Sequence, residues 1–367
     1  MKGFAKVTFL LSAVVCFIFC LAACGEKEPL YIGAIVSTES ASGPAVEGVE
    51  LLKGLTMAVD EINGKGGING RMLEIVHENP ALDAQAAVEI FDRMEEEVAP
   101  LFYISSLSYM SAALAPHAEE AGVVMTALVA TAPEVTENAD WVFRLWPTAN
   151  QEVPGIVSLI EDLGVESLGL VHLNDAYGKS IYQGLAGALA LKDIPVEASS
   201  FSFDETDFFF QVLELVDNQG IYFLGFPAHL VPIAKAIARQ NYRGIVMASN
   251  SIAIPTNRHD GSTDGIYTTV PIVYSQSYPF ARDFEEAYLA EYGEEPSHFS
   301  PCAYDFAKLV ADLMKEREVS RMNLKNELNK GFQYSGVFGD IKLLAGDRDI
   351  SIPLYAAQIR DGEVVYR

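Results

Sequence analysis

The chain contains 367 residues, half of them hydrophobic, and carries a formal net charge of −25 at pH 7. Its length exceeds that of one ordinary domain and suits two, and the apolar content allows each of the two to bury a core. So acidic a surface repels phosphate backbones and anionic lipid headgroups, which argues against nucleic acid as a partner.

The N-terminal segment has the features of a secretion signal. A short basic start precedes an apolar run over residues 7–21, and about 15 apolar residues suit a signal peptide better than a membrane-spanning helix. The run ends in Leu-Ala-Ala-Cys, which resembles a bacterial lipobox and implies cleavage before Cys24 and a lipid on that residue. We therefore expect residues 1–23 to be a lipoprotein signal peptide. An ordinary signal peptide with a chance cysteine and a retained membrane anchor are the alternatives.

Residues 24–29 then form a short tether to the first strand. The mature protein is expected to be extracytoplasmic and lipid-anchored to a bacterial membrane, in the periplasm or at the cell surface. Cys302 is the only other cysteine outside the signal peptide, so no internal disulfide is expected. Because Cys302 lies in an apolar stretch, we interpret it as a buried small residue rather than a catalytic nucleophile.

Short β-type runs alternate with helical stretches along the chain, a pattern typical of parallel sheets covered by helices. The expected strands are residues 30–36, 72–76, 101–105, 123–128, 168–173, 196–201, 221–224 and 245–248. The expected helices are residues 49–62, 83–97, 111–121, 153–163, 180–191, 208–216, 231–240, 280–292 and 304–316, with a shorter one near Asn323 and β-hairpins over 337–366. Two βα halves imply a cleft at the carboxyl ends of their strands, where open α/β sheets bind ligands.

Common motifs of catalysis and cofactor binding are missing from the sequence. It contains no HExxH, CxxC pair, Walker loop or G-x-S-x-G elbow, and its six histidines are dispersed. The glycine-rich segment 63–70 follows a helix and precedes a strand, the reverse of a dinucleotide-binding loop, so we interpret it as a helix end and a turn. We interpret the acidic runs 95–97 and 294–295 as carboxylates on solvent-exposed faces of the protein. We expect no enzyme, no cofactor and no metal, although spacing alone leaves a glycosidase-type acid pair open.

Two polar loops follow neighbouring strands of the first half. Residues 105–109, Ser-Ser-Leu-Ser-Tyr, come after a strand and open a helix, and 130–132, Ala-Thr-Ala, come after the next strand. Their hydroxyls and free backbone N–H groups would face an anion. Together they suggest a seat for a carboxylate that includes Ser108, Tyr109 and Thr131. The alternative, that these are simply helix caps, stays open on these residues alone.

Several short segments of the sequence resemble the leucine/isoleucine/valine-binding proteins of ABC importers. The similar segments are residues 60–63, 66–71, 119–122, 130–134, 142–144, 175–178, 295–297 and 303–305, and they occur in the same order as in that family. Each segment is short, but together they span nearly the whole mature chain. The resemblance implies an α/β fold of the type I periplasmic binding protein class, with two Rossmann-like lobes, a hinge and a ligand cleft between the lobes.

The resemblance also implies a division of the chain. The first lobe is expected to comprise residues 30–147 and 275–335, and the second 148–274 and 336–367. Three crossing segments would form the hinge, near Pro147, residues 270–275 and Gly336.

The resemblance assigns roles to particular residues of the cleft. Ser108 and Thr131 match residues that hold the ligand's carboxylate, and Val129 matches a backbone contact. Tyr177 and Phe226 match aromatic residues of the opposite lobe. These matches imply a small carboxylate-bearing ligand, most simply a branched-chain or other amino acid, delivered to an ABC permease and its ATPase.

One position departs from the family pattern. Asn250 stands where the family places the acid that receives the ligand's ammonium group, and losing a charge-assisted hydrogen bond costs about 1.5–3 kcal/mol. Glu47, near the end of the first strand, could supply the charge instead. Otherwise the ligand is a carboxylate or amide without an α-ammonium, such as an aromatic acid. A different class of function, ligand sensing for a receptor, would use the same cleft.

Overall fold

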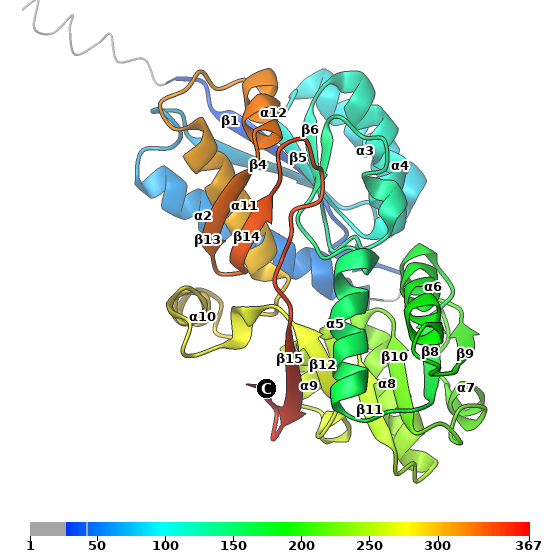
Figure 1. Cartoon of the computed structure of the whole chain (residues 1–367). Helices are drawn as coiled ribbons and strands as arrows, with labels where there is room; N and C mark the ends of the chain where they lie inside the picture. Colours follow the sequence, from blue (N-terminus) through cyan, green and yellow to red (C-terminus); the bar gives the residue numbers. More distant parts are fainter. Residues whose placement is uncertain (1–26, 42) are drawn as a thin grey trace, which may run out of the picture.

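The computed structural model describes residues 27–41 and 43–367, so the expected signal peptide and Cys24 lie outside the described residues. Two α/β lobes lie one above the other, joined by several chain segments (Figure 1). Over the described part of the chain, no helix combines the length and the apolar character that crossing a membrane requires.

The first lobe is built on a five-stranded parallel sheet with the order β4-β1-β5-β6-β7. Its strands are Leu30–Ile35 (β1), Leu73–Glu78 (β4), Phe102–Ser106 (β5), Val124–Leu128 (β6) and Val142–Arg144 (β7). Its helices are Val46–Gly64 (α2), Ala84–Glu97 (α3), Ser108–Ala121 (α4), Pro279–Tyr292 (α10), Ser300–Met314 (α11) and Arg321–Asn329 (α12). Helices α2 and α11 cover one face of the sheet, and α3 and α4 cover the other, so the sheet is buried on both sides.

The second lobe contains a seven-stranded sheet with the order β16-β15-β12-β11-β10-β8-β9. Its strands are Leu168–Leu173 (β8), Val196–Phe201 (β9), Gly220–Leu224 (β10), Ile245–Ala248 (β11), Tyr267–Val270 (β12), Tyr355–Arg360 (β15) and Glu363–Tyr366 (β16). Its helices are Ala149–Asp162 (α5), Ala176–Ala190 (α6), Phe209–Leu213 (α7), Pro227–Arg239 (α8) and Pro255–Arg258 (α9). Helices α5 and α6 pack on one face, and α7 and α8 on the other.

Smaller elements complete the chain. Two hairpins pair Glu39–Ser40 (β2) with Gly43–Pro44 (β3) and Phe332–Gly336 (β13) with Gly339–Leu343 (β14). The 3-10 helices in the described part of the chain are Pro133–Val135 (η1), Asn250–Ala253 (η2), Gly261–Thr263 (η3) and Ile272–Tyr274 (η4). In each lobe the strand order reverses once, between β1 and β5 and between β8 and β10. Such a reversal opens a crevice at the carboxyl ends of the strands.

The expected elements agree closely with the observed ones. Strands β8, β9 and β11 have the predicted bounds, and Asp83 caps α3 by accepting hydrogen bonds from the backbone N–H groups of Gln85 and Ala86, at 2.8 and 3.0 Å. Strand β7 was not predicted, because three residues are too few to show a periodic pattern, and strand β12 was also missed.

The glycine-rich segment is a helix end and a turn, as predicted. Helix α2 ends at Gly64, and Gly66 and Gly67 then have φ angles of +93° and +70°. A Cβ atom on Gly67 would lie 2.0 Å from the carbonyl oxygen of Arg71, so only glycine fits this turn.

The acidic run at 95–97 is not a simple solvated face. The Glu95 carboxylate accepts a hydrogen bond from the Tyr103 hydroxyl at 2.8 Å and two from the Arg321 guanidinium at 2.7 and 2.9 Å. Glu95 therefore joins α3, β5 and α12. The expectation was wrong for this residue because its partner lies more than 200 positions away along the chain.

The third crossing between the lobes lies later than expected. In β14 the residues alternate between buried and exposed, and Ile341 and Leu343 pack into the core of the first lobe, as do Ile350 and Ile352. The chain joins the sheet of the second lobe only at β15, and Figure 1 shows it running from the upper to the lower lobe after β14. Residues 336–352 thus pack on the first lobe, and we place the third crossing at Pro353–Leu354 rather than at Gly336. The other two passages are residues 145–148 and 271–278.

Candidate functional site

A cleft lies between the lobes, at the carboxyl ends of their parallel strands. On the first lobe its walls come from the residues after β1, β5, β6 and β7, and on the second from those after β8, β10 and β11. It contains about 420 Å³ of space not filled by atoms, part of which is open to solvent. Its position at the strand reversals is typical of sites for small molecules.

Most of the predicted site residues meet in this cleft. Those that line it are Glu47, Ser108, Val129, Thr131, Tyr177, Phe226 and Asn250. Tyr109 is not among the lining residues, and its hydroxyl donates to the carbonyl oxygen of Leu82 at 3.0 Å.

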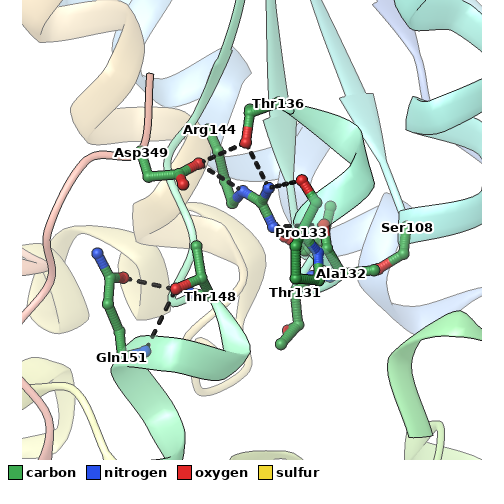
Figure 2. Close-up of polar contacts among 10 residues, drawn as sticks. Ser108, Thr131, Ala132, Pro133, Thr136, Arg144, Thr148, Gln151 and Asp349 are labelled. Atoms are coloured by element: carbon green, nitrogen blue, oxygen red, sulfur yellow. Dashed lines mark hydrogen bonds and ion pairs between the residues drawn. The ribbon is translucent and has the colours of Figure 1, made fainter. Parts of the chain in front are cut away.

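Ser108 is the first residue of α4 and connects the two polar loops. Its side chain is 5% exposed, and its Oγ accepts the backbone N–H groups of Thr131 and Ala132 at 3.1 and 3.2 Å (Figure 2). These two bonds use the lone pairs of the hydroxyl oxygen, so its proton is available to a ligand oxygen. The interpretation of this loop as a mere helix cap does not account for a hydroxyl that bonds a different loop.

The backbone beside these hydroxyls is strained. Leu107 and Val129 have positive φ angles, +65° and +51°. Positive φ is unfavourable for a β-branched residue such as Val129. Backbone strain of this kind is concentrated at ligand sites, where the surrounding structure holds it in place.

Arg144, the last residue of β7, holds the loop that carries Thr131. The guanidinium is fully buried and donates to the carbonyl oxygens of Ala130 and Ala132 at 2.9 and 2.8 Å (Figure 2). It also donates to Thr136 Oγ1 at 2.6 Å and forms an ion pair with Asp349, with 3.0 Å between Nε and Oδ1. The predicted motif 142–144 therefore has a structural role beneath the cleft. Asp349 was not predicted because it lies in an irregular segment distant in sequence.

Glu152 is a buried acid that sequence reasoning missed. It lies in the first turn of α5, which begins with a capping box formed by Thr148 and Gln151 (Figure 2). The Thr131 hydroxyl donates to Glu152 Oε1 at 3.3 Å, and burial raises the pKa of Glu152 to about 8. The only sequence signal was an acidic residue in a first helical turn, which is a common and uninformative position.

Residues of the second lobe form the opposite wall. Asp175, which was not predicted as a site residue, caps α6 by accepting the Gly178 N–H at 2.8 Å, and burial raises its pKa. Tyr177 follows it in the first turn of α6, and burial raises the pKa of its hydroxyl well above the usual range. Phe226 precedes α8, and Asn250 begins η2. Trp146 and Phe299, which are stacked on each other with ring centroids 5.8 Å apart, complete the apolar lining.

Glu47 lies in the first turn of α2, on the first lobe. Its side chain is only 7% exposed, and burial raises its pKa to about 7. Its carboxylate accepts a hydrogen bond from its own backbone N–H. It lines the cleft and also a second pocket that includes Phe203 and Ala228.

Cys302 does not take part in the site. It is fully buried in α11, its thiol donates to the Leu145 carbonyl oxygen at 2.9 Å, and burial raises its pKa well above the usual range. The interpretation as a buried small residue is confirmed. Two carboxyl groups, Glu47 and Asp175, do line the cleft, one on each lobe. Asp175 is already bonded as a helix cap, so this pair is not a free acid–base couple.

Comparison with known proteins places the chain among binding proteins. The family model described as periplasmic binding protein matches residues 29–363. The chain is similar to the Leu/Ile/Val-binding protein homolog 7 of Brucella abortus, with 27% identity over 75% of each chain. It is also similar to the amino acid binding protein of Pseudomonas aeruginosa, with 23% identity, and there the match spans about half of the relative's length, 56%.

Solved structures share the fold. One is the branched-chain amino acid transporter substrate binding protein LivJ from Streptococcus pneumoniae in complex with isoleucine, with a TM-score of 0.82, 23% identity and coverage of 92% of this chain and 100% of that one. Another is a solute binding protein of an ABC transporter from Rhodopseudomonas palustris in complex with 3,4-dihydroxybenzoic acid, with a TM-score of 0.83, 17% identity and coverage of 92% and 96%. At these identities the likeness concerns the two-lobed fold.

Proposed function

This chain belongs to the periplasmic binding protein family, and from that premise we propose that it is the extracytoplasmic solute-binding lipoprotein of an ABC importer. The relatives and structural neighbours to which it is similar include Leu/Ile/Val-binding protein homologs and a branched-chain amino acid binding protein. We propose that it binds a small carboxylate-bearing solute between its lobes, most simply a branched-chain or other amino acid, and delivers it to the permease and its ATPase. It performs no chemistry on the solute and needs no cofactor.

The observation that carries this proposal is the polar seat on the first lobe facing an aromatic wall on the second. Ser108 and Thr131 present hydroxyl groups at the carboxyl ends of β5 and β6, with the backbone of Val129 beside them. Tyr177 and Phe226 face them from the second lobe. A solute that touches both walls stabilises the closed arrangement of the lobes, which is the form that a permease would recognise.

The hinge would consist of the three chain passages, residues 145–148, 271–278 and 353–354. An ion pair between Arg258 of the second lobe and Glu295 of the first lies beside the second passage. The pair joins the two lobes next to this passage, where the Arg258 guanidinium also lies over the Tyr274 ring.

A second class of ligand is an aromatic carboxylate or an amide without an ammonium group. Two observations favour this alternative: Asn250 is neutral, and a structural neighbour is in complex with 3,4-dihydroxybenzoic acid. The aromatic rings that line the cleft could stack on such a ligand. The choice between the two classes depends on the charges of the cleft.

The anchor would be a lipid on Cys24. The expected tether, residues 24–29, is at most roughly 20 Å long when extended, so the lobes would stay close to the membrane surface. An anchored binding protein keeps its solute near the importer.

A thermal-shift screen tests the proposed function. The panel contains branched-chain, aromatic and polar amino acids together with aliphatic acids, aromatic acids and their amides. We expect at least one amino acid or carboxylate to raise the melting temperature in a saturable manner, because a ligand that binds only the folded state stabilises it by mass action. A flat response to the whole panel would contradict the proposal.

A further inference from the structure

Glu152 is a buried acid that contacts the proposed carboxylate seat from outside the cleft. It belongs to the first turn of α5, on the second lobe, and is only 2% exposed. Its Oε1 lies 3.3 Å from the hydroxyl oxygen of Thr131, a first-lobe residue that lines the cleft, whereas Glu152 itself does not line it. Any effect of Glu152 on a solute is therefore exerted through the Thr131 hydroxyl.

Three hydrogen bonds of Thr131 fix the position of this hydroxyl. The backbone N–H donates to Ser108 Oγ at 3.1 Å, and the carbonyl oxygen accepts the N–H of Ala149, the first residue of α5, at 3.2 Å. The hydroxyl forms the third bond, with Glu152. Because the backbone is held on both sides, the hydroxyl oxygen stays in place, and only the direction of its proton can change.

That direction depends on the protonation state of Glu152. An ionised carboxylate can only accept hydrogen bonds, so the Thr131 hydroxyl has to donate to it and presents only its oxygen lone pairs to the cleft. A protonated carboxyl group can instead donate to the Thr131 oxygen, and the threonine proton is then available to an oxygen atom of the solute. A solute carboxylate needs donors, so the second arrangement suits it and the first does not.

The surroundings of Glu152 bring it no positive charge. The groups on which it acts electrostatically are the hydroxyls of Tyr177 on α6 and Tyr222 on β10, and both are neutral because burial raises their pKa values well above the usual range. The acids that line the cleft, Glu47 and Asp175, have the same sign as an ionised Glu152. Within the described residues Glu152 forms no ion pair, and neither β12 nor β15, which also pack near α5, adds a charge that acts on it. Burial thus raises the pKa of Glu152 to about 8.

We propose that Glu152 is a positioning residue that makes solute binding depend on a proton: the seat holds a carboxylate when Glu152 is protonated and binds it weakly when Glu152 is ionised. This inference rests on the proposed function and concerns the regulation of the same site. A solute that meets the ionised form binds with uptake of one proton from the solvent, which ends on the Glu152 carboxylate and is returned when the solute leaves. A negative charge beside Thr131 also repels the solute carboxylate, so the lost donor and the repulsion act in the same direction.

The affinity for a carboxylate should be highest below the pKa of Glu152 and should fall as the pH rises through it, because only the protonated form leaves the Thr131 proton to the solute. Linkage to one proton predicts a fall of about tenfold between pH 7 and pH 9. It also predicts that about half a proton is taken up per solute at pH 8.

Calorimetry measures both quantities. The probes are L-leucine, L-phenylalanine, 4-methylpentanoate and 3-phenylpropanoate, and every probe that binds at pH 7 is titrated at pH 7, 8 and 9. At pH 8 the titration is repeated in buffers with different heats of ionisation, which counts the protons taken up. The variants are Glu152→Gln, Glu47→Gln, which removes another cleft acid with a raised pKa, and Asp162→Asn, a control at the exposed end of the same helix. Circular dichroism checks that each variant is folded.

Glutamine has the shape of the protonated acid and an N–H group that can donate to the Thr131 oxygen. The affinity of Glu152→Gln should therefore be the same at pH 7 and pH 9, and this variant should take up about half a proton less than the wild type at pH 8. The fall with pH should persist in Glu47→Gln and in Asp162→Asn.

A wild-type affinity that is flat between pH 7 and pH 9 would overturn the inference and leave the proposed function intact. The same holds for a fall that persists in Glu152→Gln or disappears in Glu47→Gln. If Glu152→Gln does not fold, the proton count decides: uptake of about half a proton at pH 8 by both the wild type and Glu47→Gln supports the inference, and no uptake contradicts it. Binding of none of the probes counts against the proposed function as well.

Discussion

Arg144 and Asp349 form an ion pair across 3.0 Å that joins two distant parts of the chain beneath the cleft. The Asp349 segment pairs with Arg144 as a parallel β-bridge, and the backbone N–H of Ile350 donates to the Arg144 carbonyl oxygen at 2.9 Å. The same guanidinium holds the loop that presents Thr131. The chain segment that leads to the third crossing is thus connected to the proposed carboxylate seat.

The first prediction concerns this guanidinium. Arg144→Met should lower the free energy of unfolding by about 3–5 kcal/mol, because the carbonyl groups of Ala130 and Ala132 lose a buried charged donor. Ligand affinity should fall with it, since the Thr131 loop is no longer held. Asp349→Asn is the control: Asp349 is 38% exposed, and its replacement should cost about 1 kcal/mol or less. Urea denaturation measures the free energy of unfolding of both variants. If Arg144→Met lowered it as little as Asp349→Asn does, the loop would not depend on Arg144.

The second prediction concerns the carboxylate seat. Ser108→Ala removes the hydroxyl proton that we assign to the ligand and leaves the N–H groups of Thr131 and Ala132 without their acceptor. The affinity for the ligand found in the screen should fall by about 10- to 100-fold in calorimetry. Ser111→Ala is a matched control in the same helix, because Ser111 bonds Ser105 and does not line the cleft. Unchanged affinity in Ser108→Ala would exclude the proposed seat.

The third prediction is a pH dependence caused by Glu152. Burial raises its pKa in the folded protein to about 8, above the ordinary value of 4.5. Between these two values the folded state binds more protons than the unfolded state, so the free energy of unfolding falls as pH rises from 4.5 to 8. Glutamine does not titrate, so Glu152→Gln lacks this loss. Between pH 4.5 and pH 8 its free energy of unfolding should rise by about 3–5 kcal/mol relative to that of the wild type.

Urea denaturation at pH 4.5 and pH 8 measures this difference between wild type and variant. Glu47 and Asp305, whose pKa values burial raises to about 7, contribute to the wild-type slope in the same direction, so the comparison with Glu152→Gln isolates one group. Glu120→Gln, on the exposed side of α4, is the control. Parallel pH curves for the wild type and Glu152→Gln would contradict the prediction.

The fourth prediction tests the anchor. Wild-type protein expressed in bacteria should appear in the membrane fraction with a lipid on an N-terminal Cys24, as detected by mass spectrometry. Cys24→Ala should abolish both the lipid and the membrane association. Cys302→Ser should leave both unchanged, because Cys302 is buried in the fold. Membrane association that survives in Cys24→Ala would indicate a retained anchor instead of a lipoprotein.

The fifth prediction concerns the reactivity of Cys302. Its burial and its raised pKa keep the thiol protonated and shielded, and only thiolates react with alkylating reagents. Iodoacetamide should leave the native protein unlabelled at this residue and should label it in urea. Rapid labelling of the native protein would mean that α11 opens far more often than its packing suggests.

Much of the fold follows from local sequence pattern. The apolar runs that form β8, β9 and β11 have the same bounds in the structure as in the prediction, and Asp83 caps the helix that it was expected to cap. These features depend on residues within a few positions of one another. The carboxyl ends of parallel strands must also meet at one edge of a sheet, so Ser108 and Thr131 could be placed at a cleft before any contact was known. Tyr177 was placed there only by the family resemblance.

The remaining features depend on contacts between residues far apart in the chain, which only the tertiary structure decides. Glu152 reaches Thr131, and Asp349 reaches Arg144 across more than 200 residues. The hairpin of β13 and β14 has one apolar face that either lobe could have buried, and packing placed it on the first. Whether an acid such as Glu47 is solvated or buried is likewise set by the residues that the fold brings around it. The sequence by itself determined the elements and the edge where the site lies, and packing determined which charges surround it.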